Sequence, residues 1–124
     1  MSDYSVLVVD DDADIRASIC EILCELGYQC SQAPEGNLAL CQLDRQPVDL
    51  VIIDIFLKSG SGLGVLQAMQ AQRLRAKRVV LTNYATADIR RRCAQLGADR
   101  VFDKSAELDE LLAYCAELAT SEPH

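Results

Sequence analysis

Four aspartates crowd the N-terminal part of the chain. The stretch VVDDDADIR (8–16) runs from two valines directly into Asp10, Asp11 and Asp12, and Asp14 follows one residue later. At about 5 Å and an effective dielectric constant of about 20, two carboxylates repel each other by roughly 3 kcal/mol. A helix start would relieve part of this repulsion, because helix N-termini favour acidic side chains. Three consecutive carboxylates additionally indicate a bound cation.

Three further polar residues stand at or just after the ends of apolar stretches. They are Asp54 at the end of VDLVIID (48–54), Thr82 at the end of KRVVLT (77–82) and Lys104 after RVFD (100–103). Each alone has an ordinary explanation, as a turn residue, a helix cap or a solvated charge. Because the carboxyl ends of parallel strands meet at one edge of a sheet, we expect all three to converge with Asp10 and Asp11.

Such a set of side chains fits phosphoryl chemistry. Oxygen ligands with room for water suit Mg²⁺ rather than zinc or copper. A carboxylate beside a divalent ion can act as a nucleophile toward phosphorus and form an aspartyl phosphate. The metal, the Lys104 ammonium and the Thr82 hydroxyl would supply the positive charge and the hydrogen bonds that phosphoryl oxygens need. Mg²⁺ and Lys104 would also offset the repulsion among the aspartates.

The elements that must position these residues alternate between two patterns. Runs of strand length occupy 4–9, 28–33, 48–54, 77–82 and 100–103. Helical 3.6-residue periodicity marks 13–27, 35–46, 61–73, 86–97 and 106–119. This alternation predicts an α/β domain with a mainly parallel sheet. The nearly continuous apolar runs fit central strands that are covered on both faces, and the half-polar run 28–33 belongs at an edge.

Length and composition narrow the class of protein. The chain has 124 residues, of which 50% are hydrophobic and 25% charged, so we expect one folded domain over residues 1–124 without an output domain. A formal net charge of −7 argues against a nucleic-acid partner. No apolar run approaches the roughly 20 residues of a membrane span, and the N-terminus does not resemble a signal peptide. These features predict a cytoplasmic protein with no membrane contact.

The six cysteines are dispersed, at positions 20, 24, 30, 41, 93 and 115. They form no CxxC pair, and the only histidine is the C-terminal residue, His124. Zinc sites need tighter clusters of cysteine and histidine than this. We therefore expect reduced, semi-buried thiols that act as small hydrophobic residues.

Four segments together resemble the signature segments of response-regulator receiver domains (CheY-like) of two-component signalling. They are VLVVDDD, VDLVIIDIFLKSGSGLGVL, VVLTNY and GADRVFDKS, and the likeness extends over about residues 4 to 120. The resemblance implies a flavodoxin-like (βα)5 fold, a three-layer sandwich whose five parallel strands have the order 2-1-3-4-5. It also implies a phosphorylated signalling switch rather than a turnover enzyme.

The same resemblance implies a role for each site residue. Asp54 would accept the phosphoryl group, Thr82 would close on it and Lys104 would pair with it, while Mg²⁺ would be held by Asp10, Asp11, Asp54 and the backbone carbonyl of Phe56. The phosphoryl donor would be a sensor histidine kinase or a histidine phosphotransfer protein. A downstream protein would dock on the face made by the fourth helix, the fifth strand and the fifth helix.

Four positions depart from the family pattern. Lys58 stands where the family usually has proline, Asn83 where it has a small residue, and Ser105 where it has a cis proline. The switch aromatic is replaced by Val101, with Phe102 beside it. A cis bond before a residue other than proline costs about 3–4 kcal/mol, which leaves the geometry after Lys104 open.

Two other functions share parts of this pattern. A Mg²⁺-dependent phosphatase with an aspartyl nucleophile would place that nucleophile after the first strand, where Asp10 and Asp12 form a DxD pattern. Such enzymes generally need a cap domain or substrate loops, for which 124 residues leave little room. A flavodoxin-like cofactor binder would need a phosphate-binding loop after the first strand, and the acidic residues there would repel an anion.

Overall fold

The computed structural model describes residues 4–58 and 60–121, in which strands and helices alternate as predicted. The elements are β1 (Ser5–Val9), α1 (Ala13–Glu25), β2 (Gln29–Ala33), α2 (Gly36–Arg45), β3 (Leu50–Ile53), α3 (Gly62–Ala71), β4 (Lys77–Thr82), α4 (Ala87–Gln95), β5 (Arg100–Asp103) and α5 (Leu108–Ser121). The third strand is shorter than the predicted range 48–54. Gly27 and Gly97, with φ values of 95° and 92°, end α1 and α4 in the left-handed conformation that glycine adopts without strain.

The strands form one parallel sheet of order β2-β1-β3-β4-β5. This confirms the flavodoxin-like fold class and the predicted strand order 2-1-3-4-5. Val9 in β1 pairs with Ile53 in β3, so both strands end at the same level. The residues that follow, Asp10 and Asp54, therefore lie side by side at the carboxyl edge of the sheet.

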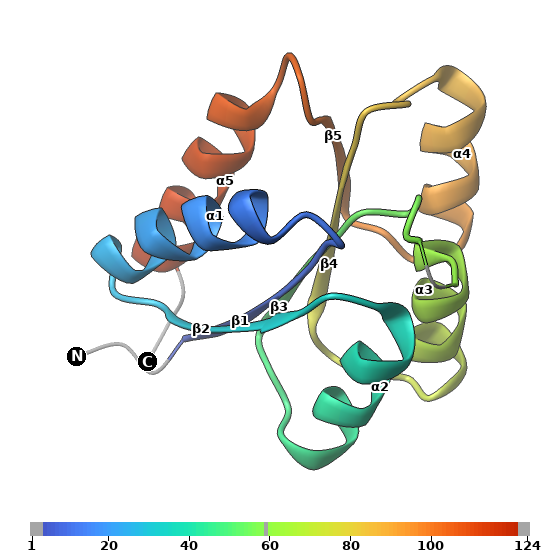
Figure 1. Cartoon of the computed structure of the whole chain (residues 1–124), viewed down its shortest axis with the longest axis horizontal. Coiled ribbons are helices and arrows are strands. Elements are labelled where there is room, and N and C mark those ends of the chain that lie inside the picture. The colour runs from blue at the N-terminus through green and yellow to red at the C-terminus, as the bar shows by residue number, and fades with distance from the viewer. Residues whose placement is uncertain (1–3, 59, 122–124) are drawn as a thin grey trace.

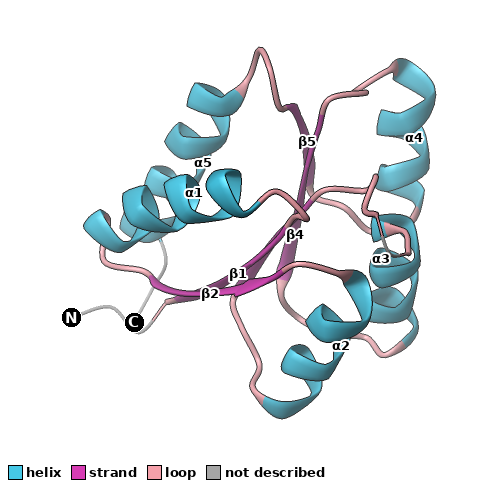
Figure 2. Cartoon of the chain, in the orientation of Figure 1, coloured by secondary structure: helices cyan, strands magenta, loops and turns pink. Residues whose placement is uncertain are grey.

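Helices cover both faces of the sheet (Figures 1 and 2). The helices α1 and α5 lie on one face, and α2, α3 and α4 lie on the other. Successive residues of β1 point to opposite faces, so Val6 and Val8 join the α1–α5 core while Leu7 and Val9 join the core under α2 to α4. Both cores are apolar, which explains why the central strands read as continuous hydrophobic runs.

The polar strand β2 lies at an edge of the sheet, as predicted. Gln29, Ser31 and Gln32 are exposed there, and the Gln42 side chain of α2 donates a hydrogen bond of 3.0 Å to the Gln32 carbonyl. This contact satisfies a backbone group that no further strand pairs within the described residues. None of the helices in the described ranges is long and apolar enough to cross a membrane.

The cysteines follow the prediction only in part. All six are free thiols; Cys20, Cys93 and Cys115 are buried and Cys30 is half-buried. Burial raises the pKa of the Cys115 thiol to about 12, so it stays protonated at neutral pH. The prediction of semi-buried side chains is wrong for Cys24 and Cys41, which are exposed because they lie on the outer faces of α1 and α2.

Candidate functional site

Three carboxylates meet at the carboxyl edge of the sheet. One oxygen each of Asp10, Asp11 and Asp54 lies within 4.8 Å of the other two. Asp10 and Asp54 are buried, with exposed fractions of 2% and 6%, and Asp11 is half-buried. The structure thus brings together three predicted metal ligands from the ends of two adjacent strands. All donors are hard oxygen atoms, the ligand type that Mg²⁺ prefers.

Lys104 joins this cluster from the end of β5. Its Nζ atom lies 2.7 Å from Asp10 Oδ2 and 2.8 Å from Asp54 Oδ2. Burial raises the pKa of Asp10, and the hydrogen bond from Lys104 opposes that effect. Burial alone would lower the pKa of Lys104, but its bonds to the two carboxylates outweigh burial and raise that pKa above 10.5. The ammonium is therefore charged at neutral pH and bridges the two buried acids.

The three consecutive aspartates do not all serve the same purpose. Asp10 accepts a hydrogen bond of 2.8 Å from the Asp12 backbone N–H. The Asp12 side chain caps α1 by accepting from the backbone N–H groups of Asp14 and Ile15, at 3.0 and 3.2 Å. Asp12 is thus a helix cap, so only two of the three consecutive acids join the cluster. Asp54 supplies the third carboxylate.

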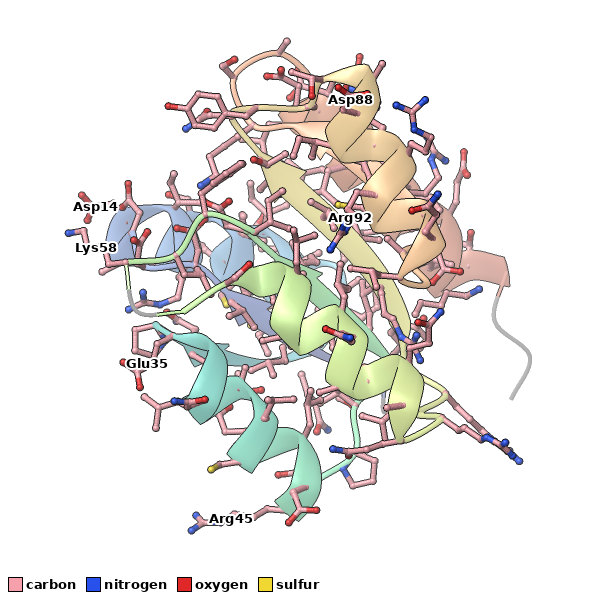
Figure 3. The ribbon with its side chains drawn as sticks, turned by 90° about the vertical axis from the view of Figure 1, so that its right-hand side faces the viewer. Asp14, Glu35, Arg45, Lys58, Asp88 and Arg92 are labelled. Carbon is pink, nitrogen blue, oxygen red and sulfur yellow. The ribbon has the colours of Figure 1, made fainter. Side chains whose placement is uncertain are left out.

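Asp11 is oriented by the loop that follows β3. Its Oδ2 atom accepts a hydrogen bond of 3.0 Å from the backbone N–H of Lys58, whose side chain projects to the same side of the molecule as Asp14 (Figure 3). A proline at position 58 would have no N–H and could not make this bond. The departure from the family pattern at Lys58 therefore adds a donor that positions Asp11.

The same loop brings Phe56 to the site. Its backbone N–H donates a hydrogen bond of 3.0 Å to Asp54 Oδ1, and the residue is 49% exposed. The loop closes onto the start of α3, where an added Cβ on Gly62 would lie 2.4 Å from the Asp54 carbonyl oxygen. Only glycine fits this approach. Coordination by the Phe56 carbonyl remains a prediction.

Thr82 is the last residue of β4, next to the Lys104 backbone just after β5, and is fully buried. Its hydroxyl accepts a hydrogen bond of 3.2 Å from the Tyr84 backbone N–H, and its carbonyl accepts one of 2.8 Å from the Lys104 N–H. The hydroxyl is thus engaged by its own loop. The hydroxyl accepts this bond through a lone pair, so its own O–H can still donate to a group bound on Asp54.

A cavity of about 210 Å³ opens onto the carboxylates. It is lined by Asp11, Asp12, Ile15, Asp54, Phe56, Asn83, Tyr84 and Lys104. The rings of Phe56 and Tyr84 meet edge to face, with centroids 5.0 Å apart and an interplanar angle of 75°. One water molecule occupies about 30 Å³ in the liquid, so the cavity has room for a tetrahedral oxyanion together with ordered water.

The structure answers the question that the sequence left open about the peptide bond after Lys104. The peptide bonds of the described residues include no cis bond. Instead, Asp103 Oδ1 accepts hydrogen bonds from the Ser105 N–H, the Ser105 hydroxyl and the Ala106 N–H, at 2.9, 2.7 and 3.0 Å. The two bonds from Ser105 lower the pKa of Asp103 most. The Asp103 side chain therefore closes an Asx-turn that holds the backbone beside Lys104.

On β5, the two residues at the switch position face opposite layers. Val101 packs on the α2–α4 side, whereas Phe102 is buried on the α1–α5 side against the ring of Tyr114.

Residue types alone did not single out Arg90 and Glu107, which form an ion pair of 2.8 Å next to β5. Their other partners are backbone groups, which leave no signal in the sequence.

Comparisons with known proteins agree with this geometry. The model of the response regulator receiver domain family matches residues 6–116. The chain is 33% identical over 109 residues to the sensor histidine kinase RcsC of Salmonella typhi, and the match covers 88% of this chain but only 12% of that protein. It is 30% identical over 111 residues to sporulation initiation phosphotransferase F of Bacillus subtilis, and the match covers 90% of each.

A solved structure of a response regulator also matches this chain in fold. The response regulator TrrA of Thermotoga maritima, determined in complex with Mg²⁺ and BeF, superposes with a TM-score of 0.81 and 35% sequence identity. The match covers 93% of this chain and 98% of that one. The fold, the acidic cluster and the family model thus agree, and the chain belongs to the response-regulator receiver domains of two-component signalling.

Proposed function

We propose that this receiver domain accepts a phosphoryl group on Asp54 in a Mg²⁺-dependent reaction. The observation that carries this assignment is the position of Asp54, a buried carboxylate within 4.8 Å of two others and 2.8 Å from an ammonium, at the wall of a cavity. Asp10, Asp11, Asp54 and the Phe56 carbonyl would hold Mg²⁺. Their hard oxygen atoms fit that ion and leave places for water.

In the reaction, a carboxylate oxygen of Asp54 attacks phosphorus, and the bond from phosphorus to the donor's nitrogen or oxygen breaks. The leaving group of a phosphohistidine donor takes a proton and departs as neutral imidazole. When bound, Mg²⁺ neutralises charge on the phosphoryl oxygens. Lys104, already 2.8 Å from Asp54 Oδ2, moves its hydrogen bond to a phosphoryl oxygen and holds the product.

Thr82 provides the conformational response. Its hydroxyl, which accepts from the Tyr84 N–H, donates its O–H to a phosphoryl oxygen, and this draws Thr82 and the loop after β4 inward. We propose that this shift alters the surface made by α4, β5 and α5, where a downstream protein docks. The domain is a signalling switch that catalyses only its own phosphorylation and dephosphorylation.

The donor is a sensor histidine kinase or a histidine phosphotransfer protein, met in the cytoplasm. This is supported by likeness to RcsC, a sensor histidine kinase, and to a sporulation phosphotransferase. The phosphatase alternative is not favoured. Its nucleophile would follow β1 in a DxD pattern, and Asp12, the second acid of that pattern, caps α1 instead.

Intact-mass spectrometry with acetyl phosphate or phosphoramidate tests the phosphoacceptor. With Mg²⁺, the mass should rise by one phosphoryl group, and Asp54→Asn should abolish the gain because the amide is not a nucleophile. Asp14→Asn is the matched control, since Asp14 is exposed at the start of α1, and it should label normally. Full labelling of the Asp54→Asn variant would overturn the assignment.

A further inference from the structure

Arg90 in α4 binds three separate segments with one guanidinium. Its Nε atom donates to the Ala85 carbonyl at 3.0 Å, Nη1 to the Val101 carbonyl at 2.8 Å, and Nη2 to Glu107 Oε1 at 2.8 Å. These partners lie in the loop after β4, in β5 and just before α5. Within the described residues β5 is an edge strand, so the guanidinium satisfies a carbonyl that no strand pairs.

Glu107 extends this contact to the backbone beside the site. Its Oε1 atom also accepts a hydrogen bond of 2.8 Å from the Asp103 N–H, and its own N–H donates to the Asp103 carbonyl at 2.7 Å. The bonds from Arg90 and Asp103 lower the pKa of Glu107, so the carboxylate is charged at neutral pH. Asp103 directly precedes Lys104, and Ala85 lies three residues after Thr82. Arg90 and Glu107 therefore join the chain next to both proposed switch residues.

We propose that Arg90 is a positioning residue that couples the loop after β4 to the β5–α5 segment. When Thr82 closes on a phosphoryl group, the Ala85 carbonyl shifts, and the guanidinium transmits that shift to Val101 and Glu107. This inference rests on the proposed function and adds the residue that carries the signal from the site to the outer edge of the sheet.

The side-chain type supports this role. A guanidinium presents five N–H donors in a rigid plane, so a displacement of one acceptor strains the bonds to the others. The ammonium of lysine is a point charge that would keep the ion pair with Glu107 but could not hold all three acceptors in one plane. The next residue, Arg91, differs, because it pairs with the exposed Asp88 of its own helix. Asp88 lies at the start of α4 (Figure 3).

Hydrogen exchange, resolved by amide, tests the coupling in four proteins: the unsubstituted chain, Arg90→Met, Arg90→Lys and the matched control Arg91→Met. Each is measured alone and with Mg²⁺ and beryllofluoride as the phosphoryl mimic. In the unsubstituted chain, the mimic should change exchange both in the loop 82–86 and in the segment 101–107. In Arg90→Met the response of 82–86 should remain, whereas that of 101–107 should fall by about ten-fold or more.

Arg90→Lys should retain an intermediate response at 101–107, and Arg91→Met should behave as the unsubstituted chain. An equal response at 101–107 in Arg90→Met and the unsubstituted chain would overturn the inference. If Arg90→Met does not fold, a full response in Arg90→Lys would overturn it as well. Failure of the unsubstituted chain to respond at 82–86 would instead count against the proposed function, so the two failures are distinguishable.

Discussion

Replacing Lys104 with methionine removes the ammonium that bridges the two buried carboxylates while keeping an unbranched side chain. Asp10 and Asp54 then lie close together without the partner that bridges them at 2.7 and 2.8 Å. Breaking a buried ion pair on one side costs about 3–5 kcal/mol of unfolding free energy. Protonation limits this cost, because one of the two carboxylates can bind a proton and become neutral. For a carboxyl group of ordinary pKa 3.8, protonation at pH 7 costs about 4 kcal/mol, since each pH unit above the pKa adds about 1.4 kcal/mol. We therefore expect a loss of about 3–4 kcal/mol at pH 7 without Mg²⁺.

The pH dependence has a definite sign. Burial already raises the pKa of Asp10 above 3.8, and loss of the lysine raises it further. The folded variant then binds more protons than the unfolded chain at any pH between the two pKa values, so its stability falls as pH rises through that window. At pH 5 the neutralisation cost is only about 1.6 kcal/mol, so the penalty should shrink to about 2 kcal/mol or less.

Urea denaturation in EDTA at pH 7 and pH 5 measures both values. Lys58→Met is the matched control, because its side chain is exposed, and it should change stability by no more than about 0.5 kcal/mol at either pH. Added Mg²⁺ should stabilise the Lys104→Met variant more than the unsubstituted chain, since no ammonium competes with the ion. An equal loss at both pH values would refute the electrostatic reasoning and show that Lys104 acts through packing.

Three further predictions concern the metal, the loop and the switch. Asp11→Ala should weaken Mg²⁺ binding by about ten-fold or more in calorimetric titrations, and an unchanged affinity would exclude Asp11 as a ligand. Gly62→Ala should lower the unfolding free energy by about 1–3 kcal/mol in urea, because its Cβ would lie 2.4 Å from the Asp54 carbonyl oxygen; a neutral result would contradict the tight closure. Tyr84→Ala should reduce phosphorylation-dependent partner binding by about 1–2 kcal/mol, whereas Val101→Ala should cost only stability, by about 1 kcal/mol. Partner affinities measured with and without beryllofluoride separate the last two, and the reverse pattern would contradict both roles.

The fold was predictable because its signals are periodic and local. The apolar runs that became β1, β3 and β4 are covered on both faces, and Gly27 and Gly97 ended their helices at the expected positions. Convergence at the carboxyl edge follows from parallel pairing, so Asp10, Asp54 and Lys104 could be placed together before any geometry was known.

The parts that could not be predicted depend on which backbone group each side chain meets. A run of three aspartates reads as one acidic feature, yet Asp12 caps α1 and Asp11 accepts from the Lys58 N–H. Arg90 reads as a surface charge in a basic stretch, but its guanidinium is bound to two backbone carbonyls. Backbone donors and acceptors are the same at every position, so residue types do not reveal such contacts.

At the two positions where this chain lacks the family's proline, the backbone makes the same kind of hydrogen bond. At Lys58 and at Ser105, a backbone N–H that proline would not have donates to a nearby carboxylate, that of Asp11 at 3.0 Å and that of Asp103 at 2.9 Å. The rigidity of the proline ring is thus replaced by hydrogen bonds to a carboxylate, which are stronger than bonds to a neutral acceptor. The pKa of Asp103 is lower in the folded protein than its ordinary value of 3.8. The stabilisation of the fold by this carboxylate is therefore complete above pH 3.8, and it is lost as the pH falls through the pKa of the folded state. The Asp103 carboxylate is therefore charged at neutral pH and accepts these hydrogen bonds beside Lys104 without a proline.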